Sequence, residues 1–174
     1  MQSGTVRSIC RTSLTASDKG AAVGRMDGKV AFITGAARGQ GRSHAVRLAE
    51  EGADIIAVDI CQPVGSVPYE MPTSADLAET AKLVEELDRR IVAREADVRD
   101  LSGLQAVVQE GISEFGHIDA VVANAGIASV APTMEMDESM WQEMIDINLT
   151  GVTLPVDAGC LQKMGGTPHV LPED

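Results

Sequence analysis

The sequence is poor in basic residues and has no long apolar run, and each shortage excludes a class of protein. Its 174 residues include 14 Lys and Arg against 26 Asp and Glu, a net charge of −12 with a pI near 4.6. Such a chain repels a phosphate backbone on average, so no nucleic-acid binding is expected. No stretch approaches the roughly 20 apolar residues of a membrane span, so no membrane role is expected.

Cysteine is also scarce. Cys10, Cys61 and Cys160 are odd in number, widely separated and without the spacing of metal ligands. They indicate reduced thiols in a cytoplasmic protein and no metal site. His44 and His117 have no third ligand nearby in the sequence, and we interpret both as structural or surface residues.

Residues 1–26 are rich in Ser, Thr, Gly and Arg and carry no acid before Asp18. This composition predicts a disordered N-terminal extension. A leader upstream of the domain's natural start at Met26 is the favoured explanation. An Arg-rich organellar transit peptide is the alternative.

A glycine-rich turn follows the first predicted strand, Val30–Ile33, and organises the chain. Gly35, Gly39 and Gly41 remove side chains where a strand must turn into a helix, so that backbone N–H groups can face a phosphate. The spacing Gly-x-x-x-Gly-x-Gly differs from the common dinucleotide fingerprint, and glycine turns also occur without a ligand. A second predicted strand, Asp54–Asp59, ends in an acid 20 residues after Gly39, about where a carboxylate meets the adenosine ribose.

Strands and helices then alternate. Strands are predicted over Ile91–Glu95 and Ile118–Asn124, and helices over Ala75–Asp88 and Leu101–Phe115. A fourth helix, capped by Asp137, is expected to turn Trp141, Met144 and Ile145 inward, with Asn148 one turn on. Asn148 is then either a satisfied core amide or a site residue. The pattern predicts an α/β fold, a Rossmann-like three-layer αβα sandwich whose parallel sheet carries its ligand crevice at the strands' carboxyl ends.

Four motifs together resemble the N-terminal half of a short-chain dehydrogenase/reductase over about Gly28 to Val152. They are Thr34–Gly41, Asp97-Val98, Asn124–Ile127 and Asn148. Within that family, residues 35–45, 58–61 and an inserted loop at 62–73 resemble the carveol-dehydrogenase-like branch associated with mycofactocin.

The resemblance implies NAD as cofactor and a secondary alcohol or ketone as the substrate of complete relatives. A carboxylate at Asp59 favours NAD because it repels the 2′-phosphate of NADP, although Arg38 and Arg42 argue weakly the other way. Asn148 would support a proton relay. The implied cofactor-binding residues are Gly35, Arg38, Gly39, Gln40, Gly41, Asp59, Ile60, Asp97, Val98, Asn124, Ala125 and Gly126.

The match breaks at the catalytic residues. The family uses a serine, a tyrosine and a lysine four positions after the tyrosine, whereas Tyr69 is the one tyrosine here and Thr73 stands where the lysine should be. An internal deletion near Thr150–Val152 would explain the loss. We therefore expect a truncated dinucleotide-binding Rossmann domain over residues 27–160, an irregular tail over 161–174, and no turnover. The alternatives are a non-catalytic dinucleotide-binding fragment or an unstable truncated product.

The deletion would also leave the strand Ala120–Ala123 with an open edge. Association through that edge, or a homo-oligomer, is expected. Alternatively, Val152–Val156 could dock beside it, with Pro155 tolerated on the new edge.

Overall fold

A computed structural model describes residues 24–153 of the chain. The predictions for the N-terminal extension, for the tail and for the strand beyond Thr153 therefore lie outside the described residues.

The described residues form a four-stranded parallel sheet in the order β3-β2-β1-β4. The strands are β1 (Val30–Thr34), β2 (Asp54–Asp59), β3 (Ile91–Glu95) and β4 (Ala120–Val122). In the register, Phe32 stands between Ile56 on one side and Val121 on the other. The order reverses between β1 and β4, which is where open sheets of this kind bind ligands.

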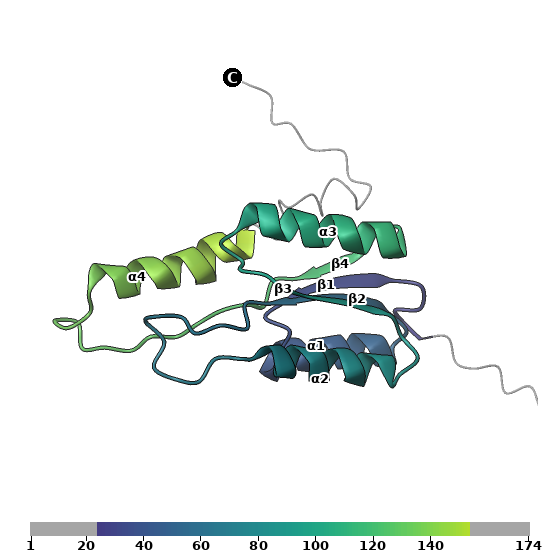
Figure 1. The fold of residues 1–174 in the computed structure, drawn as a ribbon, viewed down its shortest axis with the longest axis horizontal. Helices are drawn as coiled ribbons and strands as arrows, with labels where there is room; N and C mark the ends of the chain where they lie inside the picture. Colours follow the sequence, from purple (N-terminus) through teal and green to yellow (C-terminus); the bar gives the residue numbers. More distant parts are fainter. Residues whose placement is uncertain (1–23, 154–174) are drawn as a thin grey trace, which may run out of the picture.

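Helices cover both faces of the sheet, which confirms the predicted three layers (Figure 1). The helices α1 (Gly39–Glu50) and α2 (Ser74–Glu85) lie on one side, and α3 (Leu101–Phe115) and α4 (Glu138–Ile145) lie on the other. The π-helical turn η1 (Asp146–Thr150) continues α4. No helix in this part of the chain is long and apolar enough to cross a membrane.

The sheet has a separate apolar core on each face. Phe32, Ile56 and Leu104 pack between the sheet and α3, whereas Ile33 and Ile55 pack toward α1 and α2. Every residue of β1 and β2 is buried, which is why the stretches 30–33 and 55–58 are apolar without alternation. At Gly111 a Cβ would lie 2.2 Å from Cδ1 of Ile56, so α3 approaches the sheet too closely for a side chain there.

Element ends differ from the predictions where side chains replace backbone pairing. The strand β4 ends before the predicted Asn124, because the N–H groups of Asn124 and Ala125 donate to Oγ1 of Thr34 instead of to a neighbouring strand. Thr73 caps α2 in a reciprocal capping box with Asp76.

One prediction near the end of the described chain is wrong. Trp141 does not face inward: it is 57% exposed, and α4 has no fully buried residue because it lies beyond the strand ends and covers little of the sheet. Val152 and Thr153 continue the helical turn instead of pairing with β4. Docking of Leu154–Val156 against that strand falls outside the described residues.

Candidate functional site

The glycine turn between β1 and α1 brings backbone to the sheet's carboxyl edge. Gly35 and Gly39 have φ of +66° and +56°, which glycine adopts most easily. A Cβ on Gly41 would lie 1.9 Å from the carbonyl oxygen of Gly35, so that position tolerates no side chain. A Cβ on Gly39 would meet nothing within 4 Å, because this residue faces open space. Within residues 24–153, no side chain caps the N-terminus of α1. These uncapped N–H groups suit an anion.

Asp59 ends β2 beside this turn. Its side chain is buried, and its Oδ2 accepts a hydrogen bond from the N–H of Ala37 at 3.0 Å. Its Oδ1 accepts from the N–H of Cys61 at 3.3 Å. The carboxylate is therefore held in place by the glycine turn on one side and by the start of the inserted loop on the other.

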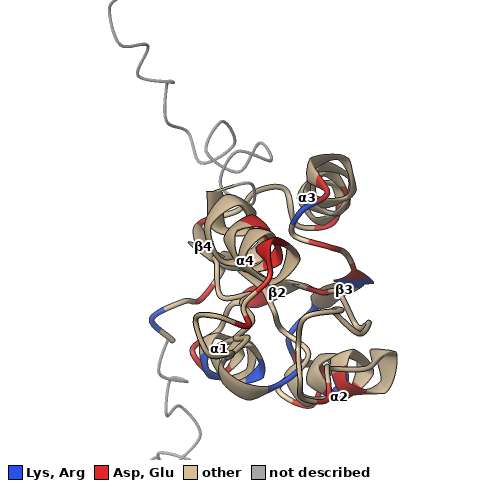
Figure 2. Ribbon diagram, turned by 90° about the vertical axis from the view of Figure 1, so that its left-hand side faces the viewer, with Lys and Arg blue, Asp and Glu red and all other residues tan. Residues whose placement is uncertain are grey.

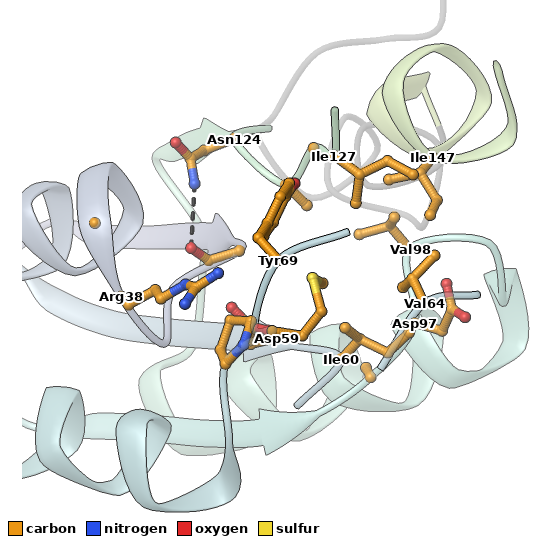
Figure 3. A pocket seen from close by; sticks show the side chains of 17 residues that line it. Arg38, Asp59, Ile60, Val64, Tyr69, Asp97, Val98, Asn124, Ile127 and Ile147 are labelled. Carbon is orange, nitrogen blue, oxygen red and sulfur yellow. Dashed lines mark hydrogen bonds between the residues drawn. The ribbon is translucent and has the colours of Figure 1, made fainter. Parts of the chain in front are cut away.

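A pocket of about 230 Å³ opens where these elements meet (Figure 3). Its lining comes from the glycine turn, the end of β2, the inserted loop, the β3–α3 turn and the segment after β4. The structure brings together ten of the thirteen predicted site residues here: Gly35, Arg38, Gly39, Asp59, Ile60, Asp97, Val98, Asn124, Ala125 and Gly126.

Asp97 lies at one end of the pocket and is paired with Arg99. The shortest distance from the Arg99 guanidinium to the Asp97 carboxylate is 2.6 Å. Burial by itself would raise the pKa of Asp97, but the hydrogen bonds and charge of Arg99 outweigh it and lower the pKa. Asp97 is therefore ionised at neutral pH.

Asn124 closes the other end of the pocket against the glycine turn. Its Nδ2 donates to the carbonyl oxygens of Thr34 at 3.0 Å and Gly35 at 3.2 Å. Figure 3 shows this side chain directed back toward the turn. Asn124 thus connects the segment after β4 to the end of β1 and the start of the glycine turn.

Three predicted residues do not line the pocket. Gln40 and Gly41 lie in the first turn of α1, behind Gly39. Asn148 lies in η1, where its Oδ1 accepts from the N–H of Ile127 at 2.8 Å and its Nδ2 donates to the Ile127 carbonyl at 2.8 Å. Its amide is satisfied by backbone, and it positions the segment that leaves the pocket.

The inserted loop supplies pocket residues that the sequence did not indicate: Val64, Tyr69, Met71 and Pro72. Tyr69 stands across the pocket in Figure 3, and its hydroxyl accepts from the N–H of Ala128 at 3.0 Å. Ile127 and Ile147 complete the apolar wall, packed with Val64 and Val98. No local motif marked the four loop residues or Ile147, because they reach the pocket only through long-range contacts.

Other charged groups are used structurally. Arg42 turns away from the pocket and donates to Oγ1 of Thr80 and to the carbonyls of Ala37 and Asp76. His117 pairs with Asp119 at 2.9 Å. Among residues 24–153, no group of three or more His, Cys, Asp or Glu side chains is placed to hold a metal ion.

Comparison with known proteins agrees with this geometry. The family model described as short chain dehydrogenase matches residues 29–167. The chain belongs to the short-chain dehydrogenase family. A (-)-trans-carveol dehydrogenase from Rhodococcus erythropolis is 55% identical over 130 residues, which are 74% of this chain and 47% of that protein.

Two solved structures extend the comparison to the fold. Carveol dehydrogenase from Mycobacterium avium, in complex with NAD, is 55% identical with a TM-score of 0.78, and the match covers 81% of this chain and 51% of that one. A short chain dehydrogenase from Mycobacterium paratuberculosis, bound to NAD, is 48% identical with a TM-score of 0.79, covering 81% and 52%. The chain spans about half the length of the curated relatives it matches.

Proposed function

We propose that this chain is the NAD-binding half of a short-chain dehydrogenase and that it performs no hydride transfer by itself. The observation that carries the proposal is the meeting of Gly39, Asp59 and Asn124 in one pocket, although they come from three separate strand ends. The NAD-bound relatives of the same fold support it.

The residues present fit a dinucleotide. Gly39 leaves open space beside the uncapped start of α1, where a pyrophosphate would be held by backbone N–H groups. Asp59, buried beside that turn, would accept from the adenosine ribose. Ile60 and Val98 would contact the adenine, with Asp97 at its edge. The enclosed volume is below the roughly 300–1,000 Å³ of typical small-molecule sites, which suits one end of the cofactor.

The charges favour NAD over NADP. The Asp59 carboxylate would repel a 2′-phosphate. Arg42 is engaged by α2, and the Arg38 guanidinium donates to the carbonyl of Glu70 at 2.6 Å. An arginine already engaged in this way offsets less of the repulsion from Asp59.

The proton-transfer residues of a complete family member are absent from the pocket. When bound, the nicotinamide accepts or gives a hydride. The reaction also needs an acid/base group whose pKa lies near neutral pH. The hydroxyl of Tyr69 is engaged with Ala128. Of the lysines that the structure describes, Lys29 pairs with Asp119 at the amino end of β1, and Lys82 is exposed on α2. Neither forms a hydrogen bond or ion pair with Tyr69.

A secondary alcohol or ketone remains the substrate that we propose for complete relatives. A cytoplasmic location remains a proposal that rests on the few, widely separated cysteines of the sequence. Association through the open edge of β4, or as a homo-oligomer, remains a prediction that size-exclusion chromatography tests.

Isothermal titration calorimetry and thermal shift with NAD, NADP and AMP test the proposal. Trp141 does not line the pocket, so its fluorescence is a poor reporter. We expect NAD at 100 times its Kd to stabilise the fold by about 2.7 kcal/mol, with NADP weaker. Asp59→Asn should raise the Kd for NAD about tenfold and reduce the ratio of the affinity for NAD to that for NADP. The charge-matched control Asp27→Asn, exposed and outside the pocket, should bind as the parent does.

Three outcomes separate the alternatives. NAD binding without alcohol oxidation supports the non-catalytic binding half. No shift with 1 mM NAD, with ready aggregation, would mean an unstable product without function. Turnover of alcohols with NAD at rates typical of enzymes, about 1–1,000 per second, would contradict the proposal.

A further inference from the structure

Glu143, on α4, joins two loops that line the proposed nucleotide pocket. Its Oε2 accepts the backbone N–H of Ser66, in the inserted loop, at 2.9 Å. Its Oε1 lies 3.4 Å from the Arg99 guanidinium, and Arg99 in turn holds Asp97. Glu143 thus connects three elements that are far apart in the sequence.

The inserted loop depends on such contacts. Within residues 60–73, one backbone hydrogen bond is formed, from the N–H of Val67 to the carbonyl of Val64. The Ser66 residue is instead held from outside, by Glu143 and by Oγ of Ser129, which donates to the Ser66 carbonyl at 2.7 Å. A loop with so little internal backbone bonding keeps its pocket-lining side chains in place only while external contacts hold it.

The second half of the contact is electrostatic. Hydrogen bonding from Ser66 lowers the pKa of Glu143, and the Arg99 guanidinium lowers it further, so this carboxyl is ionised at neutral pH. Hydrogen bonding to Asp97 likewise raises the pKa of Arg99, against the effect of burial. The charges therefore alternate along Asp97, Arg99 and Glu143 from the pocket wall to α4.

The neighbouring acids Asp137, Glu138 and Asp146 do not contact the loops that line the pocket. Residues 134–150 carry five acids and no Lys or Arg, and α4 accordingly shows red without blue in Figure 2. Asp137 caps α4 and Asp146 accepts from Gln142, which is on the same helix. None of the hydrogen bonds or ion pairs among the described residues involves the side chain of Glu138.

We propose that Glu143 is a positioning residue for the adenosine end of the cofactor. It holds the inserted loop over the pocket and, through Arg99, fixes Asp97, so that nucleotide affinity is coupled to the position of α4. This inference rests on the proposed function for its ligand. Without the contact, the loop would be held from outside by Ser129, Arg38 and Ala128. A bound nucleotide would have to supply the ordering that Glu143 provides, and that ordering opposes binding.

Hydrogen exchange and nucleotide titration on matched variants test this inference. Glu143→Ala should speed exchange of the peptide containing Ser66 and raise the Kd for NAD and AMP about tenfold. Because α4 has no buried residue, the melting temperature of the Glu143→Ala protein should fall by less than about 4 °C. This corresponds to a loss of about 1 kcal/mol or less in the free energy of unfolding. Glu138→Gln, on the same helix, should match the parent in all three measurements.

A conservative variant separates positioning from general stability. Glu143→Gln keeps an acceptor for the Ser66 N–H but loses the charge that faces Arg99. It should therefore restore most of the exchange protection while leaving nucleotide affinity about threefold below the parent. Loss of thermal stability alone would not produce this split.

Parent-like exchange and affinity in Glu143→Ala would overturn the inference. Global unfolding of that variant, with Glu143→Gln parent-like in both measurements, would do the same, because it would mean a merely structural role. Failure of the parent chain to bind NAD and AMP would overturn the proposed function and the nucleotide part of this inference. The exchange comparison would then still decide whether Glu143 holds the loop.

Discussion

Two glycines of the same turn should respond to the same substitution to very different degrees. A methyl group at Gly41 would lie 1.9 Å from the Gly35 carbonyl oxygen and 2.9 Å from Cα of Ala36. Both are backbone atoms of a buried turn, so they cannot move aside without breaking the approach of α1 to β1. A methyl group at Gly39 would meet nothing within 4 Å.

The magnitudes follow from these geometries. We expect Gly41→Ala to cost more than about 4 kcal/mol, which is exceptional for a single substitution and a large share of a typical domain's stability. Gly39→Ala places alanine at φ of +56°, a strain of about 1–2 kcal/mol, or roughly 5 °C in melting temperature for this size. Its methyl group would, however, occupy the space that we assign to the pyrophosphate.

Thermal unfolding and NAD calorimetry on the two variants test this reasoning. Gly39→Ala should remain folded and lose at least about tenfold in NAD affinity, whereas Gly41→Ala should lose most of its cooperative unfolding transition. Equal melting temperatures for the two variants would refute the steric argument. Unchanged NAD affinity in Gly39→Ala would refute the location of the phosphate.

Two further predictions concern titratable groups. Burial would raise the pKa of Asp54, but hydrogen bonds from Arg90 and the charges of Arg89 and Arg90 outweigh it and lower the pKa. The resulting stability is present above the unfolded pKa of about 3.9 and is lost as the pH falls through the lower folded pKa. Asp54→Asn should therefore destabilise by about 2 kcal/mol in urea unfolding at pH 7, and by less near pH 3. Burial, followed by the charge of Asp59, raises the pKa of Cys61 to about 12, so alkylation of its thiol at pH 7.5, followed by mass spectrometry, should be far slower than in the unfolded chain. Rapid alkylation of folded protein would contradict this.

The fold could be predicted because its signals are local. The buried runs of β1 and β2 and the glycine turn each follow from residues within a few positions of one another. Hydrophobic period and capping chemistry act over such short ranges. Trp141 was misplaced because periodicity indicates an apolar face but not what covers it.

The residues of the candidate site also fall into a group that local sequence predicts and a group that it does not. Gly39, Asp59 and Asn124 could be named from sequence because each lies at or after the end of a strand, and parallel strands bring their carboxyl ends to one edge. Val64, Tyr69 and Glu143 could not, because their positions depend on how an irregular loop packs against a helix that begins 65 residues after the loop ends.

The amino-acid sequence by itself determined the parallel sheet, the glycine turn and the acid beside it, since backbone preferences and strand ends specify them locally. Tertiary structure alone decided that Arg42 donates hydrogen bonds to α2 and that the amide of Asn148 bonds to the backbone of Ile127. It also decided that the inserted loop completes the pocket. Those partners are chosen by three-dimensional packing among distant segments, which no local pattern encodes.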